Sequence, residues 1–103
     1  MKIFVSYTTL DKEINKEFLL NLYCLLRPWS EVFIDLINND SVCKQDRVLE
    51  ELRTCNVLIL IVSPNVWHSK WVNFELSKAR SRGIPIIEIS RMFLLNLMPR
   101  IIF

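Results

Sequence analysis

Six consecutive aliphatic residues, VLILIV at Val57–Val62, limit the folds open to this chain more than any other segment does. A strand with one wet face alternates apolar and polar residues, whereas a strand covered on both faces is apolar throughout. The run is also far shorter than the roughly 20 residues that a membrane-spanning helix needs. It therefore predicts a strand at the centre of a parallel sheet that has helices on both faces.

Strand-like and helix-like segments alternate on both sides of this run. We expect further strands at 3–7, 31–35 (EVFID), 85–89 (PIIEI) and 100–103, and helices at 12–26, 46–54, 70–82 and 91–97. The first four strands start about every 26 to 29 residues, which is the length of a βαβ unit. A series of such units gives a parallel sheet, because the crossovers are right-handed almost without exception and place helices on the sheet faces.

These units predict one α/β domain over residues 1–103, flavodoxin-like and built of three α/β/α layers. Its central parallel sheet would have four to five strands in the order 2-1-3-4-5, and a short last segment would leave the fold truncated at the C-terminus. Ligands of such sheets bind at the carboxyl ends of the strands, near the switch point between the first and third. The loops after Tyr7, Asp35, Val62 and Ile89 are therefore expected to surround one crevice.

Polar residues and the single glycine mark where the expected helices begin and end. Asp11 is expected to cap the N-terminus of the helix at 12–26, and Ser69 that of the helix at 70–82. Gly83 follows the second of these helices, in the position typical of a C-terminal cap. The segment Leu36–Gln45 holds a cluster of Asn, Asp and Ser residues, which predicts a loop.

Charge and cysteine content exclude several classes of site. The 13 basic and 11 acidic residues are interspersed, so no nucleic-acid footprint is expected. Three cysteines without CxxC spacing and one histidine, His68, predict neither a disulfide framework nor a metal site. The strand-like KIFVSY follows Met1 directly, without a secretory leader, so we expect a cytoplasmic protein that does not insert into a membrane.

The scarcity of glycine excludes the common nucleotide-binding loops. With Gly83 alone, neither a GxGxxG nor a GxxxxGK[ST] motif can exist. A receiver domain would need an acceptor aspartate at the end of the third strand, where Val62 is followed by Ser63 and Pro64. A serine hydrolase would need a GxSxG elbow, which is absent, and His68 is interpreted as an ordinary loop histidine. Any nucleotide must be held in another way.

Four segments, in order along the chain, resemble the TIR (Toll/interleukin-1 receptor) family in its bacterial form. The opening strand and turn are similar to the family's first box, and the other three are similar to its second strand, its third strand with the following helix, and its fourth strand. The segments are IFVSYTTLD at 3–11, FID at 33–35, CNVLILIVSPNVWHSKWVNFEL at 55–76 and GIPIIEI at 83–89. The resemblance implies a single TIR-like domain.

The resemblance also implies a catalytic residue. Many TIR domains cleave NAD⁺ between nicotinamide and ribose, and their catalytic glutamate follows a tryptophan by four positions, as Glu75 follows Trp71. Residues at i and i+4 share a helix face, and a carboxylate near the ribose can stabilise the positive charge of the cleavage reaction. The alternatives are a solvated Glu75 paired with Lys78 or Lys70, and a Trp71 that serves only for packing.

Further residues are expected at the substrate pocket. In the family, the positions of Tyr7, Thr8 and Thr9 line the nucleotide pocket, and Asp35 opens the segment known as the BB loop. Together with Trp71 they form the predicted substrate-binding set, whose alternative interpretation is plain turn chemistry and loop solvation. The segment Leu36–Gln45 departs from the family, because it lacks the Gly or Pro that its BB loop usually carries.

Three functions stay open at this stage. The first is a NAD⁺ glycohydrolase or cyclase in immune or anti-phage signalling, with NAD⁺ as substrate and no cofactor or metal. The second is an adaptor without turnover, which associates with itself or with another TIR protein; the reduced C-terminal segment and exposed candidates such as Trp67 support it. The third is a sensor that binds a nucleotide without cleaving it. The Trp-x-x-x-Glu spacing favours the enzyme.

Overall fold

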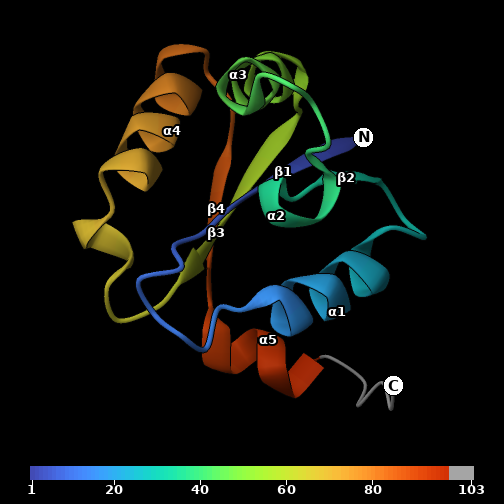
Figure 1. Ribbon diagram of the computed structural model, residues 1–103, viewed down its shortest axis with the longest axis vertical. Coiled ribbons are helices and arrows are strands. Elements are labelled where there is room, and N and C mark those ends of the chain that lie inside the picture. The colour runs from blue at the N-terminus through green and yellow to red at the C-terminus, as the bar shows by residue number, and fades with distance from the viewer. Residues whose placement is uncertain (98–103) are drawn as a thin grey trace.

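The structure, a computed structural model, describes residues 1–97, and its centre is a parallel sheet (Figure 1). Within these residues the sheet has four strands in the order β2-β1-β3-β4, with every neighbouring pair parallel. The strands are β1 (Lys2–Ser6), β2 (Glu31–Phe33), β3 (Val57–Val62) and β4 (Ile86–Ser90). The predicted order is confirmed for these strands. The strand predicted at 100–103, and with it the predicted truncation, lies outside the described residues.

Helices cover both faces of the sheet, as the three-layer prediction requires (Figure 1). One face carries α1 (Lys16–Leu26) and α5 (Arg91–Leu97), and the other carries α3 (Lys44–Thr54) and α4 (Lys70–Ser81). Two separate clusters of buried apolar side chains fill the spaces between these layers. The α/β flavodoxin-like class is therefore confirmed. No helix within the described range is long and apolar enough to cross a membrane.

Strand β3 lies in the interior of the sheet, between β1 and β4. Its side chains alternate between the two buried clusters: Ile59 and Ile61 belong to the cluster under α1, and Leu58 and Leu60 to the cluster under α4. Because neither face meets water, the strand is apolar at every position. This arrangement confirms the central placement predicted for Val57–Val62.

The start of α1 differs from the prediction. The helix begins at Lys16 instead of residue 12, and its N-cap is Asn15, whose Oδ1 accepts a hydrogen bond from the Phe18 amide at 2.9 Å. The assignment of Asp11 as N-cap was wrong. Its two carboxylate oxygens accept bonds from the backbone and side-chain nitrogens of Asn65, each at 2.8 Å. Asp11 thus joins the loops after β1 and β3, a long-range contact that local pattern does not reveal.

The segment predicted as strand end and loop contains a helical turn. Strand β2 ends at Phe33, and residues Asp35–Asn38 form α2, so the predictions of a strand through Asp35 and of a continuous loop at 36–45 were wrong. Asn38 Oδ1 accepts from the Ile34 amide at 2.8 Å, and Asn39 Nδ2 donates to Asp35 Oδ1 at 2.7 Å. Such local side-chain bonds compact the polar cluster into a turn.

The boundaries of α4 follow the predicted signals, and these boundaries fix the position of Glu75. Ser69 ends a short 3₁₀ turn, η1 (Val66–His68), and its Oγ accepts from the Val72 amide at 3.2 Å as the N-cap of α4. Gly83 adopts φ 69°, which an L side chain rarely tolerates, just beyond the end of the helix. The N-terminal turns of α4 consequently lie at the carboxyl edge of the sheet.

Candidate functional site

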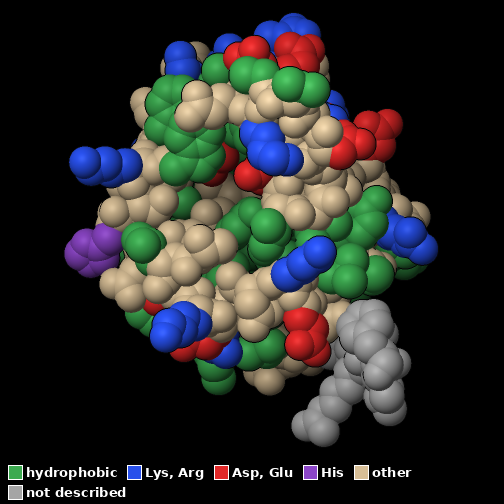
Figure 2. Space-filling model, in the orientation of Figure 1, with side chains coloured by type: hydrophobic (Ala, Val, Ile, Leu, Met, Phe, Trp, Pro, Cys, Tyr) green, Lys and Arg blue, Asp and Glu red, His purple; other side chains and the backbone are tan. Residues whose placement is uncertain are grey.

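A cavity of about 300 Å³ opens at the carboxyl ends of β1 and β2, beside the N-terminal half of α4. In Figure 2, acidic side-chain atoms are visible inside a hollow on this side of the molecule, between hydrophobic and basic groups. The lining residues are Val5, Tyr7, Thr8, Thr9, Asp35, Leu36, Ser69, Trp71 and Glu75. All six residues of the predicted site are among them. The structure therefore brings the set together, and the chemical role of each residue stays a prediction.

Glu75 is a buried acid in this wall. Its side chain is 4% exposed, and Oε1 accepts a hydrogen bond of 2.8 Å from the hydroxyl group of Ser6. No ion pair of Glu75 is found within residues 1–97, and Lys78 lies over the ring of Phe74 instead, 5.7 Å from its centroid. These contacts contradict the alternative of a solvated carboxylate paired with Lys78 or Lys70.

The surroundings of Glu75 favour its protonated form. Burial raises the pKa of the Glu75 carboxyl to about 8, and the nearby charge of Asp35 raises it further, while hydrogen bonding by Ser6 and Trp71 opposes the increase. A carboxyl group with such a pKa exchanges its proton close to neutral pH, which suits acid–base work. Glu75 can therefore donate or accept a hydrogen bond from a bound molecule under ordinary conditions.

Tyr7 joins the end of β1 to α2 across the cavity. Its phenolic oxygen accepts a hydrogen bond from the Leu36 amide at 3.0 Å. Burial raises the pKa of Tyr7 to about 12, opposed by the Leu36 bond and reinforced by the charges of Asp35 and Glu75. The phenol thus keeps its proton at neutral pH, and this proton remains available to a ligand.

The other polar residues of the cavity have local roles in shaping it. Thr8 is 5% exposed, and its hydroxyl oxygen accepts from the Leu10 amide at 3.2 Å, as expected of a turn residue. Thr9 is exposed at the rim. Asp35 is partly buried, and the side chain of Asn39 holds one of its oxygens. The carboxylate of Asp35 therefore has a fixed direction at the mouth of the cavity.

Trp71 forms an aromatic wall. Its ring stacks on Phe74 with centroids 5.2 Å apart and planes at 21°, and 38% of the side chain remains exposed. Of the two interpretations, packing residue or pocket wall, the structure supports the wall. Trp71 also borders a second cavity of about 130 Å³, which shares Asp35 with the first and adds Lys44, Gln45 and Val48.

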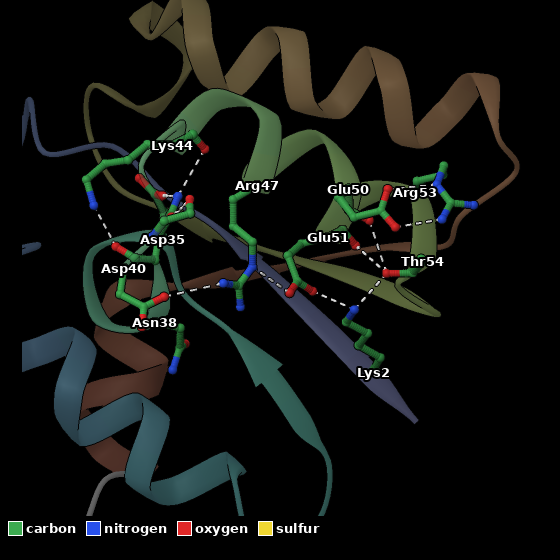
Figure 3. A network of polar contacts seen from close by, with 12 residues as sticks. Lys2, Asp35, Asn38, Asp40, Lys44, Arg47, Glu50, Glu51, Arg53 and Thr54 are labelled. Atoms are coloured by element: carbon green, nitrogen blue, oxygen red, sulfur yellow. Dashed lines mark hydrogen bonds and ion pairs between the residues drawn. The ribbon is translucent and has the colours of Figure 1, made fainter.

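The second cavity introduces a positive charge that the sequence-based set did not contain. Lys44 is the first residue of α3, and its ammonium group donates to the backbone carbonyl of Asn39 at 2.6 Å. Figure 3 shows Lys44 beside Asp35 and apart from the ion pairs further along α3. There Arg47 contacts Glu51 and Asp40, and Lys2 contacts Glu51, so these charges compensate one another. Lys44 thus lines a cavity together with Asp35 and Trp71 of the predicted substrate set.

Two residues of evident chemical interest were missed by sequence reasoning. Ser6 lies inside the IFVSYTTLD segment, directly after the apolar residues of the strand, and a buried serine must find a hydrogen-bond partner, which was a usable signal. Lys44 had no comparable signal, because its position depends on how the polar segment before α3 folds. The described residues contain no group of three acidic, cysteine or histidine side chains placed to hold a metal ion.

The doubly wound sheet, with a pocket at its carboxyl edge and a buried acid on the helix after β3, defines a flavodoxin-like α/β domain with a ligand-sized site. The family model for the Thoeris protein ThsB, TIR-like domain, matches residues 4–93. The chain therefore belongs to this family, and the predicted resemblance to TIR domains is confirmed.

Other comparisons bear on the fold. No curated protein sequence matches the chain. Among solved structures, it is similar to a 2-desoxiribosyltransferase from Leishmania mexicana, with a TM-score of 0.65 and 20% sequence identity. The match covers 86% of this chain and 63% of that protein, so the chain spans less than two thirds of its length. At this identity the likeness shows a shared fold alone.

Proposed function

We propose that this protein cleaves NAD⁺ at the bond between nicotinamide and ribose, as a glycohydrolase or cyclase. The observation that carries the proposal is the placement of Glu75, a buried acid in the wall of a cavity at the carboxyl edge of a TIR-like sheet. Its distance of four residues from Trp71 puts both side chains on one face of α4.

The size of the site fits one half of a dinucleotide. The main cavity of about 300 Å³ is at the lower end of the range typical for small-molecule sites, roughly 300 to 1,000 Å³. We therefore assign it to the nicotinamide and its ribose. The second cavity, with the ammonium group of Lys44, would take the neighbouring phosphate groups, because an anion gains from a nearby cation.

The chemistry needs a negative charge near the ribose. When the bond between the nicotinamide nitrogen and the ribose carbon breaks, both electrons leave with nicotinamide, and positive charge develops on the sugar. The ionised form of Glu75, whose population grows as the pH approaches the pKa of about 8, would stabilise that charge. Attack by water gives ADP-ribose and releases one proton, which the carboxylate can accept; attack by a group within the substrate gives a cyclic product.

The test is release of nicotinamide from NAD⁺, followed by chromatography over a range of protein concentrations. We expect release by the unaltered protein and its loss in Glu75→Gln. The matched control is Glu88→Gln, since Glu88 is an exposed acid on β4 and lies outside the cavity. Release at an undiminished rate by Glu75→Gln would overturn the assignment of Glu75.

A second candidate is an adaptor that works by association with itself or another TIR protein. The observation in its favour is a group of exposed apolar side chains on β4 and α5, here called the apolar face. Its members are Ile87, Met92, Phe93, Leu95 and Leu97, which are 41–63% exposed. Exposed apolar groups of this kind often mark interaction surfaces. Self-association in sedimentation, without nicotinamide release at any concentration, would favour the adaptor.

The family and the cysteines support a proposal for the cellular setting. The described structure contains three free cysteines, Cys24, Cys43 and Cys55, which suits a reducing compartment. We place the activity in the cytoplasm, in immune or anti-phage signalling. Calorimetry with NAD⁺ and ADP-ribose would distinguish an enzyme from a sensor, because a sensor binds NAD⁺ and leaves it intact.

A further inference from the structure

Ser6 is the residue that connects Glu75 to the sheet. It is the last residue of β1, a strand paired on both sides, with Ser6 itself aligned with Leu60 of β3. The side chain is 1% exposed, and its hydroxyl group donates to Glu75 Oε1 at 2.8 Å. A donor on a doubly paired strand has little freedom to move, so its bond fixes the acceptor.

The helix that carries Glu75 is equally well anchored. The apolar side chains of Val72, Leu76 and Ala79 on α4 are at most 2% exposed and pack against the sheet, and Ser69 caps the helix. Between these fixed elements, only the flexible side chain of Glu75 can vary in position. Ser6 holds the Oε1 atom of this side chain, and Trp71, on the same face of α4, also hydrogen-bonds the carboxyl group.

We propose that Ser6 is a positioning residue for Glu75: the Ser6 hydroxyl group binds one carboxyl oxygen and so fixes the direction in which the carboxyl group faces the ligand in the cavity. The proposal rests on the proposed function of Glu75. It assigns to a buried strand residue a specific part in the reaction: Ser6 touches no substrate atom, and it acts through the carboxyl group that does.

The charges around Glu75 give the hydrogen bond from Ser6 a second effect, which is on the pKa of Glu75. The titratable groups that face Glu75 are the phenol of Tyr7, from the end of β1, and the carboxylate of Asp35, from α2, and the charge of Asp35 disfavours a charged Glu75. Lys44, from α3, lies in the neighbouring cavity. Ser6 and Trp71 are the groups that lower the pKa of Glu75 against burial. Removing the hydroxyl group should therefore raise this pKa.

The first test measures nicotinamide release as a function of pH for Ser6→Ala and Ser6→Thr. A hydrogen bond to a charged group corresponds to about one pH unit or more in its ionisation. We expect Ser6→Ala to shift the acid limb of the kcat profile, along which kcat rises as Glu75 loses its proton, upward by about one pH unit and to lower kcat near neutral pH about tenfold. KM should change less than about threefold, and Ser6→Thr, which keeps the hydroxyl group, should restore most of kcat.

The matched control is Ser63→Ala. Ser63 is a second buried serine at the carboxyl edge of the sheet, directly after β3, and it lies outside the cavity. This variant measures how far kcat falls when any buried hydroxyl group at the carboxyl edge of the sheet is lost. An equal loss of kcat in Ser63→Ala and Ser6→Ala, with an unchanged pH profile in both, would overturn the positioning role.

The second test does not require enzyme activity. In protein labelled with ¹³C at the glutamate carboxyl carbons, NMR titration follows Glu75, whose signal is identified by its absence in Glu75→Gln. We expect its midpoint to rise in Ser6→Ala and to stay unchanged in Ser63→Ala. Should Ser6→Ala fail to fold, Ser6→Cys replaces it, with nearly the same volume and a weaker donor. An unchanged Glu75 titration in the folded variant would overturn the proposal.

The two tests separate the inference from the proposed function. If the unaltered protein releases no nicotinamide while the NMR midpoint moves in Ser6→Ala, cleavage of NAD⁺ is overturned and the control of Glu75 by Ser6 is supported. If nicotinamide is released while neither the pH profile nor the NMR midpoint moves, the positioning role alone is overturned.

Discussion

The cavity and the apolar face depart in opposite ways from the usual distribution of side chains, because the cavity buries polar groups and the apolar face exposes apolar ones. At the cavity, the polar side chains of Ser6, Thr8 and Glu75 are buried, with exposed fractions of 5% or less. On the apolar face, Phe93 and Met92 are more than half exposed. Burying an acid and exposing an aromatic ring both oppose folding stability. The contrast underlies the two proposals made above, a polar ligand at the first place and a protein partner at the second.

Glu75→Gln gives the sharpest test of the cavity side of this contrast. We expect nicotinamide release to fall at least about 100-fold, because removing a group that stabilises transition-state charge has effects of this order. The amide keeps an acceptor oxygen for Ser6, so the free energy of unfolding at neutral pH should stay within about 1 kcal/mol. Activity assays together with urea denaturation measure both. A large loss of stability would mean that Glu75 mainly supports the fold.

The pH dependence of stability tests whether Glu75 is buried as an acid. Its pKa is about 8 in the folded chain against 4.5 as the ordinary value, so the folded state binds the proton more tightly. The contribution of Glu75 to the free energy of unfolding should then be largest below pH 4.5 and should decline as the pH rises towards 8. In this range the free energy of unfolding should fall by up to about 1.4 kcal/mol per pH unit.

Urea denaturation between pH 5 and 9 checks this expectation, with Glu75→Gln as the reference. The variant has no titrating group at position 75, so the difference between the two curves isolates its contribution. Parallel curves would show that Glu75 titrates as an ordinary exposed acid, and the contrast between cavity and apolar face would lose its strongest element.

Lys44→Ala examines the second cavity. Loss of a single phosphate-binding charge near the surface should raise KM for NAD⁺ several-fold, with kcat changed by less than about twofold, because the group would bind substrate and transition state equally. Lys12→Ala is the matched control, since Lys12 is an exposed lysine outside both cavities. Equal KM values in the two variants would contradict the assignment of the second cavity to the phosphate groups of NAD⁺.

Phe93→Ser tests the apolar face and should have the smallest effect on the monomer. The ring is 54% exposed, so the free energy of unfolding should change by no more than about 0.5 kcal/mol. Self-association, measured by sedimentation velocity, should weaken. Unchanged association would show that this face carries no contact between copies, and a clear loss of monomer stability would show that the ring belongs to the core.

Local sequence patterns predicted the bounds of a strand or helix correctly where one kind of interaction fixes those bounds. The run at Val57–Val62 predicted the bounds of β3, and Ser69 and Gly83 marked the ends of α4 as expected. A strand between two layers and a capped helix each depend on neighbours in sequence. The same reasoning was wrong for Asp11 and for residues 35–45, because polar residues can satisfy their hydrogen bonds locally or with a distant loop.

The sequence by itself determined the α/β class and the order of the elements, because periodicity is a property of neighbouring positions. Its resemblance to TIR domains implied the six residues that line the pocket. Only the tertiary structure decided that Glu75 is buried, that Ser6 is its partner and that Lys44 borders the site. The bond from Ser6 to Glu75 joins residues 69 positions apart. The pKa of an acid depends on everything packed around it, and that environment exists only once the sheet and its helices have assembled.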